Sequence, residues 1–162
     1  MLFSRRENAI RRILIVEDEP LVAFDNEHFL GREGYRVVAT VDSVAAALEA
    51  IAAEPIDLVL ADVSLSDGGD GVEVAREARS RGISVLFVTG HCPVEARPLA
   101  LGCLAKPYAQ RDLLLAIHVA EALVHGRKPR RVPRGLSLFD GPDNIPGDPG
   151  NDPAGGPPIE QA

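Results

Sequence analysis

Apolar runs alternate with segments of helical periodicity between residues 12 and 125. Residues 13–16 and 56–63 are mostly apolar, which is typical of strands buried on both faces of a sheet. Residues 35–41 are rich in β-branched side chains, which favour strands, and residues 83–88 form a further apolar run. With a weaker run at residues 101–105, the pattern predicts five strands.

Four segments between or after these strands are predicted to be helices. Pro20 suits the first turn of the first helix, and Gly31 and Gly34 follow its last apolar residue, where helices commonly end. Asp42 or Ser43 can cap the second helix. The predicted helices cover residues 20–30, 44–53, 72–81 and 111–125.

This alternation predicts an α/β fold, because strands separated by helices of about ten residues form βαβ units on a parallel sheet. We expect a doubly wound, five-stranded parallel sheet over residues 12–125, preceded by an N-terminal extension, residues 1–11. Residues 126–162 hold eight of the 13 prolines and seven of the 15 glycines. They contain too few apolar groups to offset the entropy of ordering, so we predict a disordered C-terminal tail.

Composition narrows the class of protein. Residues 1–125 carry 12 basic and 19 acidic groups, so they account for the whole net charge of −7, which argues against nucleic-acid binding by this part. No apolar run approaches the ~20 residues that span a bilayer. The chain starts without a signal-peptide pattern, and Cys92 and Cys103 make no disulfide framework, which favours a cytoplasmic protein without a membrane partner.

Polar side chains are found where the predicted strands end. Parallel α/β sheets bind their ligands outside the carboxyl ends of the strands. We therefore expect carboxylates, a hydroxyl and an ammonium at one edge of the sheet. They belong to Glu17, Asp18 and Glu19 after the first strand, Asp62 at the third, Thr89 at the fourth and Lys106 at the fifth.

This set of groups suits phosphoryl chemistry. Neighbouring carboxylates repel one another, and Mg²⁺ relieves that repulsion while keeping several waters. Asp62 then stays ionised as a nucleophile towards phosphorus, and Mg²⁺, Thr89 and Lys106 can contact the new phosphoryl oxygens. A purely structural interpretation is also open, in which Asp18 serves a helix N-terminus, Asp62 caps a loop and Thr89 has no role.

Lys106 favours the functional interpretation. The chain has 15 arginines and two lysines, and the other lysine lies in the predicted tail. A compact ammonium fits a crowded phosphoryl site better than a planar guanidinium does.

Four stretches, residues 13–20 (ILIVEDEP), 57–65 (DLVLADVSL), 88–90 (VTG) and 104–108 (LAKPY), match one known pattern. Through them the chain resembles the receiver domain of response regulators in two-component signalling. Residues 87–91 (FVTGH) are also similar to the Phe-Ala-Thr-Gly-Tyr signature of certain alphaproteobacterial stand-alone receivers, from which Val88 and His91 depart.

The resemblance implies a flavodoxin-like sheet with strand order 2-1-3-4-5. It also implies that a histidine kinase or a histidine phosphotransfer protein phosphorylates Asp62. Thr89 and Lys106 would be the switch residues, with a cis bond between Lys106 and Pro107. The implied Mg²⁺ ligands are Asp18, Asp62 and the backbone carbonyl of Ser64, with Glu17 acting through water.

Two features depart from the family. Cys103 stands three residues before the lysine, where the family often has an aromatic side chain. The stretch between Thr89 and Lys106 is short and contains Pro93 and Pro98. An interior proline costs a helix about 3 kcal/mol, so we expect the fourth helix of the family to be short or irregular here.

The sequence thus predicts a single-domain response regulator, a phosphoacceptor rather than an enzyme, that signals through a protein partner or a phosphorelay. Two alternatives stay open. A small aspartyl-phosphate phosphatase would need an acid/base Asp two residues after its nucleophile, where this chain has Ser64. A receiver-like interaction module that is never phosphorylated would not need Asp18, Asp62, Thr89 and Lys106 together.

Overall fold

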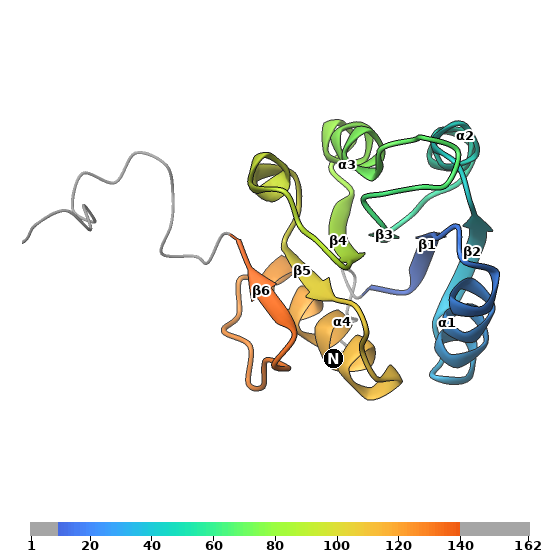
Figure 1. Cartoon of the computed structure of the whole chain (residues 1–162). Helices are drawn as coiled ribbons and strands as arrows, with labels where there is room; N and C mark the ends of the chain where they lie inside the picture. The colour runs from blue at the N-terminus through green and yellow to red at the C-terminus, as the bar shows by residue number, and fades with distance from the viewer. Residues whose placement is uncertain (1–9, 140–162) are drawn as a thin grey trace, which may run out of the picture.

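A six-stranded sheet forms the centre of the fold (Figure 1). The computed structural model describes residues 10–139 and gives the strand order β2-β1-β3-β4-β5-β6. The first five strands run parallel, in the order 2-1-3-4-5 that the family resemblance implies. The strands are β1 (Arg12–Val16), β2 (Arg36–Val41), β3 (Leu58–Ala61), β4 (Ser84–Thr89), β5 (Gly102–Ala105) and β6 (Leu136–Leu138).

Helices cover both faces of the sheet, as Figure 1 shows. Helices α2 (Val44–Ala53) and α3 (Gly71–Ser80) lie on one face, and α1 (Pro20–Arg32) and α4 (Gln110–Val124) lie on the other. Successive residues of a strand point to opposite faces. In β1, Leu14 therefore joins the core under α2 and α3, while Ile13 joins the core against α1 and α4. Both cores must be apolar, which explains the uninterrupted apolar runs.

The starts of α1 and α2 follow the signals of the sequence, whereas α1 runs two residues past its predicted end at residue 30. Pro20 is the first residue of α1, and the Ser43 hydroxyl accepts a hydrogen bond from the amide of Ala46 at 3.2 Å to cap α2. Helix α1 passes through Gly31, and the chain leaves it at Gly34, whose φ of 94° favours glycine. Among the described residues, no helix combines the length and apolarity that a membrane span requires.

The segment between β4 and β5 is irregular, as the two prolines predict. It holds a single 3₁₀ helix, η1 (Val94–Leu99), with Pro98 inside it. A proline removes a backbone donor, so a full α-helix does not form here.

The structure differs from the sequence prediction at the C-terminal side. We expected five strands and a disordered segment from residue 126, but β6 pairs antiparallel with β5. Six of the eight prolines of that segment lie beyond residue 139, so the average composition of the segment hid a Leu-Ser-Leu strand. The two leucines of this strand pack against the core that α1 and α4 cover. Residues 1–9 and 140–162, which belong to the predicted extension and tail, lie outside the described residues.

Candidate functional site

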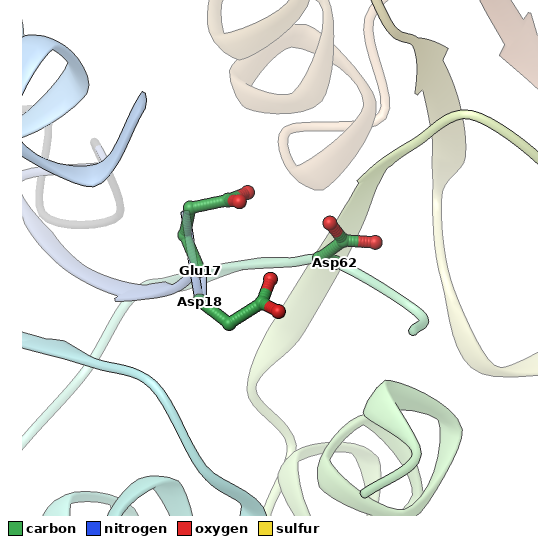
Figure 2. Close-up of side chains that lie close together, drawn as sticks. All are labelled: Glu17, Asp18 and Asp62. Atoms are coloured by element: carbon green, nitrogen blue, oxygen red, sulfur yellow. The ribbon is translucent and has the colours of Figure 1, made fainter. Parts of the chain in front are cut away.

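The predicted polar residues lie at the carboxyl edge of the parallel strands. Glu17 and Asp18 follow β1, Asp62 follows β3, Thr89 ends β4 and Lys106 follows β5. Figure 2 shows the side chains of Glu17, Asp18 and Asp62 projecting from the ends of two neighbouring strands into one region.

Backbone hydrogen bonds hold these residues in line with the sheet. The amide of Asp62 donates to the carbonyl of Val16 at 3.0 Å, and the amide of Lys106 donates to the carbonyl of Thr89, also at 3.0 Å. The parallel ladders thus continue one residue past the strand ends. The positions of the functional side chains are therefore fixed by the same pairing that builds the sheet.

The three carboxylates are close enough to share one ligand. Glu17, Asp18 and Asp62 each offer one oxygen within 4.8 Å of the others. Glu17 and Asp62 are only 4% and 7% exposed, and Asp18 is half-buried. The Asp62 Oδ1 also accepts a hydrogen bond from the amide of Ser64 at 3.2 Å.

Lys106 bridges two of these carboxylates. Its Nζ donates to Asp62 Oδ2 at 2.8 Å and to both carboxylate oxygens of Glu17, at 3.0 and 2.8 Å. Glu19 lies farther away, with Oε1 at 3.7 Å from Nζ. One ammonium thus faces several carboxylates.

Burial and hydrogen bonding shift the pKa values of Glu17 and Lys106 in opposite directions. Burial raises the pKa of Glu17 above its ordinary value, although the hydrogen bond from Lys106 lowers it in part. Burial disfavours the charged form of Lys106, but the hydrogen bonds that it donates to Asp62 and Glu17 outweigh this and raise its pKa. Lys106 is therefore charged at neutral pH, and its single charge does not balance Glu17, Asp18 and Asp62. This charge excess and the oxygen donor set fit a hard divalent cation.

A cleft of about 1030 Å³ lies over the carboxylates. Asp62, Ser64, Thr89 and Lys106 line it, so the structure brings all the predicted residues except Glu17 to one cavity, and Glu17 joins through its bonds to Lys106. Thr89, which lines the cleft, is 4% exposed. The peptide bond between Lys106 and Pro107 is cis, as the resemblance implies.

Sequence reasoning missed other residues of this cleft. Arg76 and Glu95 also line it, and no sequence pattern singled them out, while His91, noted only as a departure from the signature of residues 87–91, lines it too. Gly71 was missed as well. A Cβ there would lie 1.8 Å from the carbonyl oxygen of Asp62, so only glycine lets α3 begin this close to the functional strand. Gly71 directly follows the helix cap Asp70, and this glycine at the first position of a helix is the sequence signal for the close approach.

The response regulator receiver domain model matches residues 13–118 of this chain. The chain belongs to this family. Receiver domains are phosphoacceptors of two-component signalling rather than enzymes, and histidine kinases or phosphotransfer proteins phosphorylate them.

Similar curated proteins are bacterial regulators. The transcriptional regulatory protein PdtaR of Mycobacterium tuberculosis is 34% identical over 116 residues, which cover 68% of this chain and 56% of PdtaR. The phyllosphere-induced regulator PhyR of Methylorubrum extorquens is 30% identical over 125 residues, covering 74% of this chain and 46% of PhyR. The receiver chain thus spans about half the length of the curated relatives it matches.

Solved receiver structures share the fold. A CheY-like response regulator receiver domain from Methanospirillum hungatei superposes with a TM-score of 0.64 at 28% identity, covering 72% of this chain and 97% of that one. The receiver domain of Erythrobacter litoralis PhyR gives a TM-score of 0.63 at 27% identity, covering 76% and 98%.

Proposed function

We propose that this receiver domain accepts a phosphoryl group on Asp62 from a histidine kinase or a histidine phosphotransfer protein. The observation that carries the proposal is the position of the Asp62 carboxylate. It is 7% exposed, lines the cleft, and shares Lys106 with Glu17 beside a further carboxylate, Asp18. A carboxylate that lines a cleft and is held beside an ammonium can act as a nucleophile towards phosphorus.

Asp18, Asp62 and the backbone carbonyl of Ser64 would hold Mg²⁺, with Glu17 contributing through water. The test of fit is the donor set: three carboxylates within 4.8 Å and one ammonium leave an excess of negative charge that an oxygen-liganded cation balances. Bound there, the ion would supply positive charge for the oxygens of the transferred group.

The side chains of the domain catalyse the transfer themselves. A bond forms between an Asp62 carboxylate oxygen and phosphorus, and the bond from phosphorus to the donor breaks. Lys106, already bonded to Asp62 Oδ2 at 2.8 Å, stays beside the new phosphoryl group and stabilises its charge. The Thr89 hydroxyl at the end of β4 contacts another phosphoryl oxygen. Water later hydrolyses the acyl phosphate, so the domain dephosphorylates itself.

Signalling then proceeds through a phosphorylation-dependent protein partner or a phosphorelay in the cytoplasm. The alternative of an aspartyl-phosphate phosphatase is disfavoured, because Ser64 cannot act as the acid/base that such an enzyme needs two residues after its nucleophile.

Intact-mass spectrometry tests the proposal. The chain is incubated with acetyl phosphate and Mg²⁺, with and without excess EDTA. We expect one phosphoryl group per chain with Mg²⁺ and none with EDTA. Equal phosphorylation in both samples would refute the role of the metal, and the absence of phosphorylation in both would refute the proposed function.

A further inference from the structure

Strand β6 covers the edge of β5. Leu136, Ser137 and Leu138 pair antiparallel with Leu104, Cys103 and Gly102. The amide of Ala105 donates to the carbonyl of Gly135 at 2.9 Å, and the amide of Phe139 donates to the carbonyl of Leu101 at 3.1 Å. Without this pairing, the edge of the parallel sheet would present unpaired backbone groups, which bind extended chains.

The edge of β5 is shaped to accept a strand. A Cβ at Gly102 would lie 2.5 Å from the carbonyl oxygen of Ser137, so glycine allows the close approach of β6. Leu136 is buried and Leu138 packs beside it against the core under α4, while Ser137 is exposed. The edge therefore selects an extended segment with two apolar side chains flanking a polar one.

Contacts of Phe139 connect β6 with the segment that follows the phosphorylation cleft. Its ring packs against the core on the α3 face, and the guanidinium of Arg97 in η1 lies 5.8 Å from the ring centroid. The segment carrying Arg97 begins directly after β4, whose last residue, Thr89, lines the cleft, and His91 lines it too. A shift of residues 91–101 would therefore move Arg97 and change its contact with Phe139.

Strand β6 is held by few interactions. It pairs over three residues and is joined to α4 by residues 125–135, whose Arg127, Lys128 and Arg130 are exposed. Short edge elements with exposed connections open locally at far lower free energy than the whole domain. Detaching β6 would leave the five parallel strands and both helix layers in place.

We propose that β6 is a displaceable occupant of a strand-binding edge, and that phosphorylation at Asp62 releases it so that an extended segment of a partner protein can pair with β5. That β6 can be displaced is argued from its contacts, and its release by phosphorylation rests on the proposed function. The partner segment would carry apolar, polar and apolar side chains followed by an aromatic, as residues 136–139 do.

The expected direction of the effect starts from the place of Thr89 beside the cleft. A phosphoryl group on Asp62 attracts the Thr89 hydroxyl, and with it Gly90 and His91, towards the cleft. That movement draws the η1 segment away from Phe139 and weakens the hold on β6. An attached β6 competes with the partner, so the apparent affinity of the edge for the partner is proportional to the fraction of molecules in which β6 is detached.

A labelled peptide with the sequence of residues 132–140 tests the docking edge by fluorescence anisotropy on the full chain. Leu136→Asp places a charge at a buried position and should release β6, whereas Ser137→Asp, a matched control, changes its exposed neighbour. We expect the peptide to bind Leu136→Asp at least about tenfold more tightly than the control. Adding Gly102→Ala to Leu136→Asp should abolish binding, because it closes the edge to any strand. Equal affinity for the two single variants would overturn the proposal.

Phosphorylation of the wild-type chain tests the coupling. Samples with and without acetyl phosphate are compared by peptide anisotropy and by hydrogen exchange at the amides of Ala105 and Phe139, with intact mass recorded in parallel. We expect tighter peptide binding and faster exchange at both amides in the phosphorylated chain. Phosphorylated protein with unchanged or slower exchange there would overturn the coupling. A chain that is not phosphorylated would contradict the proposed function instead, and the Leu136→Asp comparison would still decide whether the edge binds a strand. As a control for folding, hydrogen exchange in β1 and β3 of Leu136→Asp should match that of the wild-type chain.

Discussion

The apolar run over residues 56–63 carries an aspartate near each end, and the two aspartates have different surroundings. Asp57 precedes β3, and its Oδ2 accepts hydrogen bonds from the amides of Arg11 and Arg12 at 3.1 and 2.8 Å. Its Oδ1 lies 3.3 Å from the Arg12 guanidinium. Asp62 follows β3, shares the Lys106 ammonium with Glu17, and has Asp18 beside it.

The difference follows from the direction of parallel strands. At the amino end, the backbone presents N–H groups that a carboxylate can accept from, so Asp57 links β1 to β3 and is fully provided with donors. At the carboxyl end, the sheet gathers side chains of several strands, and carboxylates there exceed the available cations. The first arrangement stabilises the fold, whereas the second leaves charge for a ligand to balance.

The largest expected effect is on phosphorylation, which should require Asp62 but not Asp57. Asp62→Asn should lose all phosphorylation by acetyl phosphate, because an amide oxygen is not an anionic nucleophile. Asp57→Asn should retain it, since Asp57 lies at the opposite end of the strand. Intact mass gives the answer. Phosphorylation of Asp62→Asn at the wild-type level would place the phosphoryl group elsewhere.

The second prediction concerns the shared cation. Lys106→Met should lower the free energy of unfolding by about 3 kcal/mol without Mg²⁺, because it leaves Glu17 and Asp62 buried without their partner. Chemical denaturation measures this loss. Combining Lys106→Met with Asp62→Asn should recover part of it, since one of the facing charges is then gone. If the double variant is no more stable than Lys106→Met, the unpartnered charges of Glu17 and Asp62 are not the cause of the lost stability.

The sequence predicted the placement of these polar residues at the carboxyl edge of the sheet, because the signals for that placement are local. Each candidate residue lies at or just after the end of a buried apolar run, and parallel pairing then brings the ends of these runs together. The cap at Ser43 and the irregular segment around Pro98 also follow from local chemistry.

Features that depend on distant partners could not be predicted in this way. Arg12 and Asp57 are 45 residues apart, and the sequence gives no sign of their ion pair. Strand β6 is three residues long, and it is stabilised by pairing with β5 rather than by its own propensity. The approach of Gly71 to Asp62 likewise depends on how α3 packs.

Magnesium should stabilise the chain through the carboxylates at the carboxyl end of the sheet and not through Asp57 at the amino end. A ligand that binds only the folded state stabilises it by about 2.7 kcal/mol at 100 times its dissociation constant. We expect Mg²⁺ to raise the Tm of the wild-type chain and of Asp57→Asn equally, and to have little effect on Asp18→Asn, which lacks one carboxylate of the cluster. Calorimetry with a Mg²⁺ series tests this. An equal rise in Asp18→Asn would show that the ion binds elsewhere.

The smallest expected effect is the pH dependence of Asp57. Burial alone would raise its pKa, but the hydrogen bonds from the amide and guanidinium of Arg12 and from the amide of Arg11 outweigh burial, so the pKa lies below the ordinary 3.8. A carboxylate whose pKa is lower in the folded state stabilises the fold at pH values above its pKa in the unfolded state. This contribution is lost as the pH falls through the pKa of the folded state. Because the pair is partly exposed and screened, we expect Asp57→Asn to lose about 1 kcal/mol at pH 7.

The difference between wild type and Asp57→Asn should stay constant from pH 7 down to about pH 5 and then shrink below the ordinary carboxylate pKa of about 4. Urea denaturation at several pH values measures it. Asp25→Asn, which removes an exposed carboxylate of α1, is the matched control and should show little difference at any pH. A gap for Asp57→Asn that stays constant down to pH 3 would mean that side-chain shape, and not the ionised carboxylate, links β1 to β3 at this end.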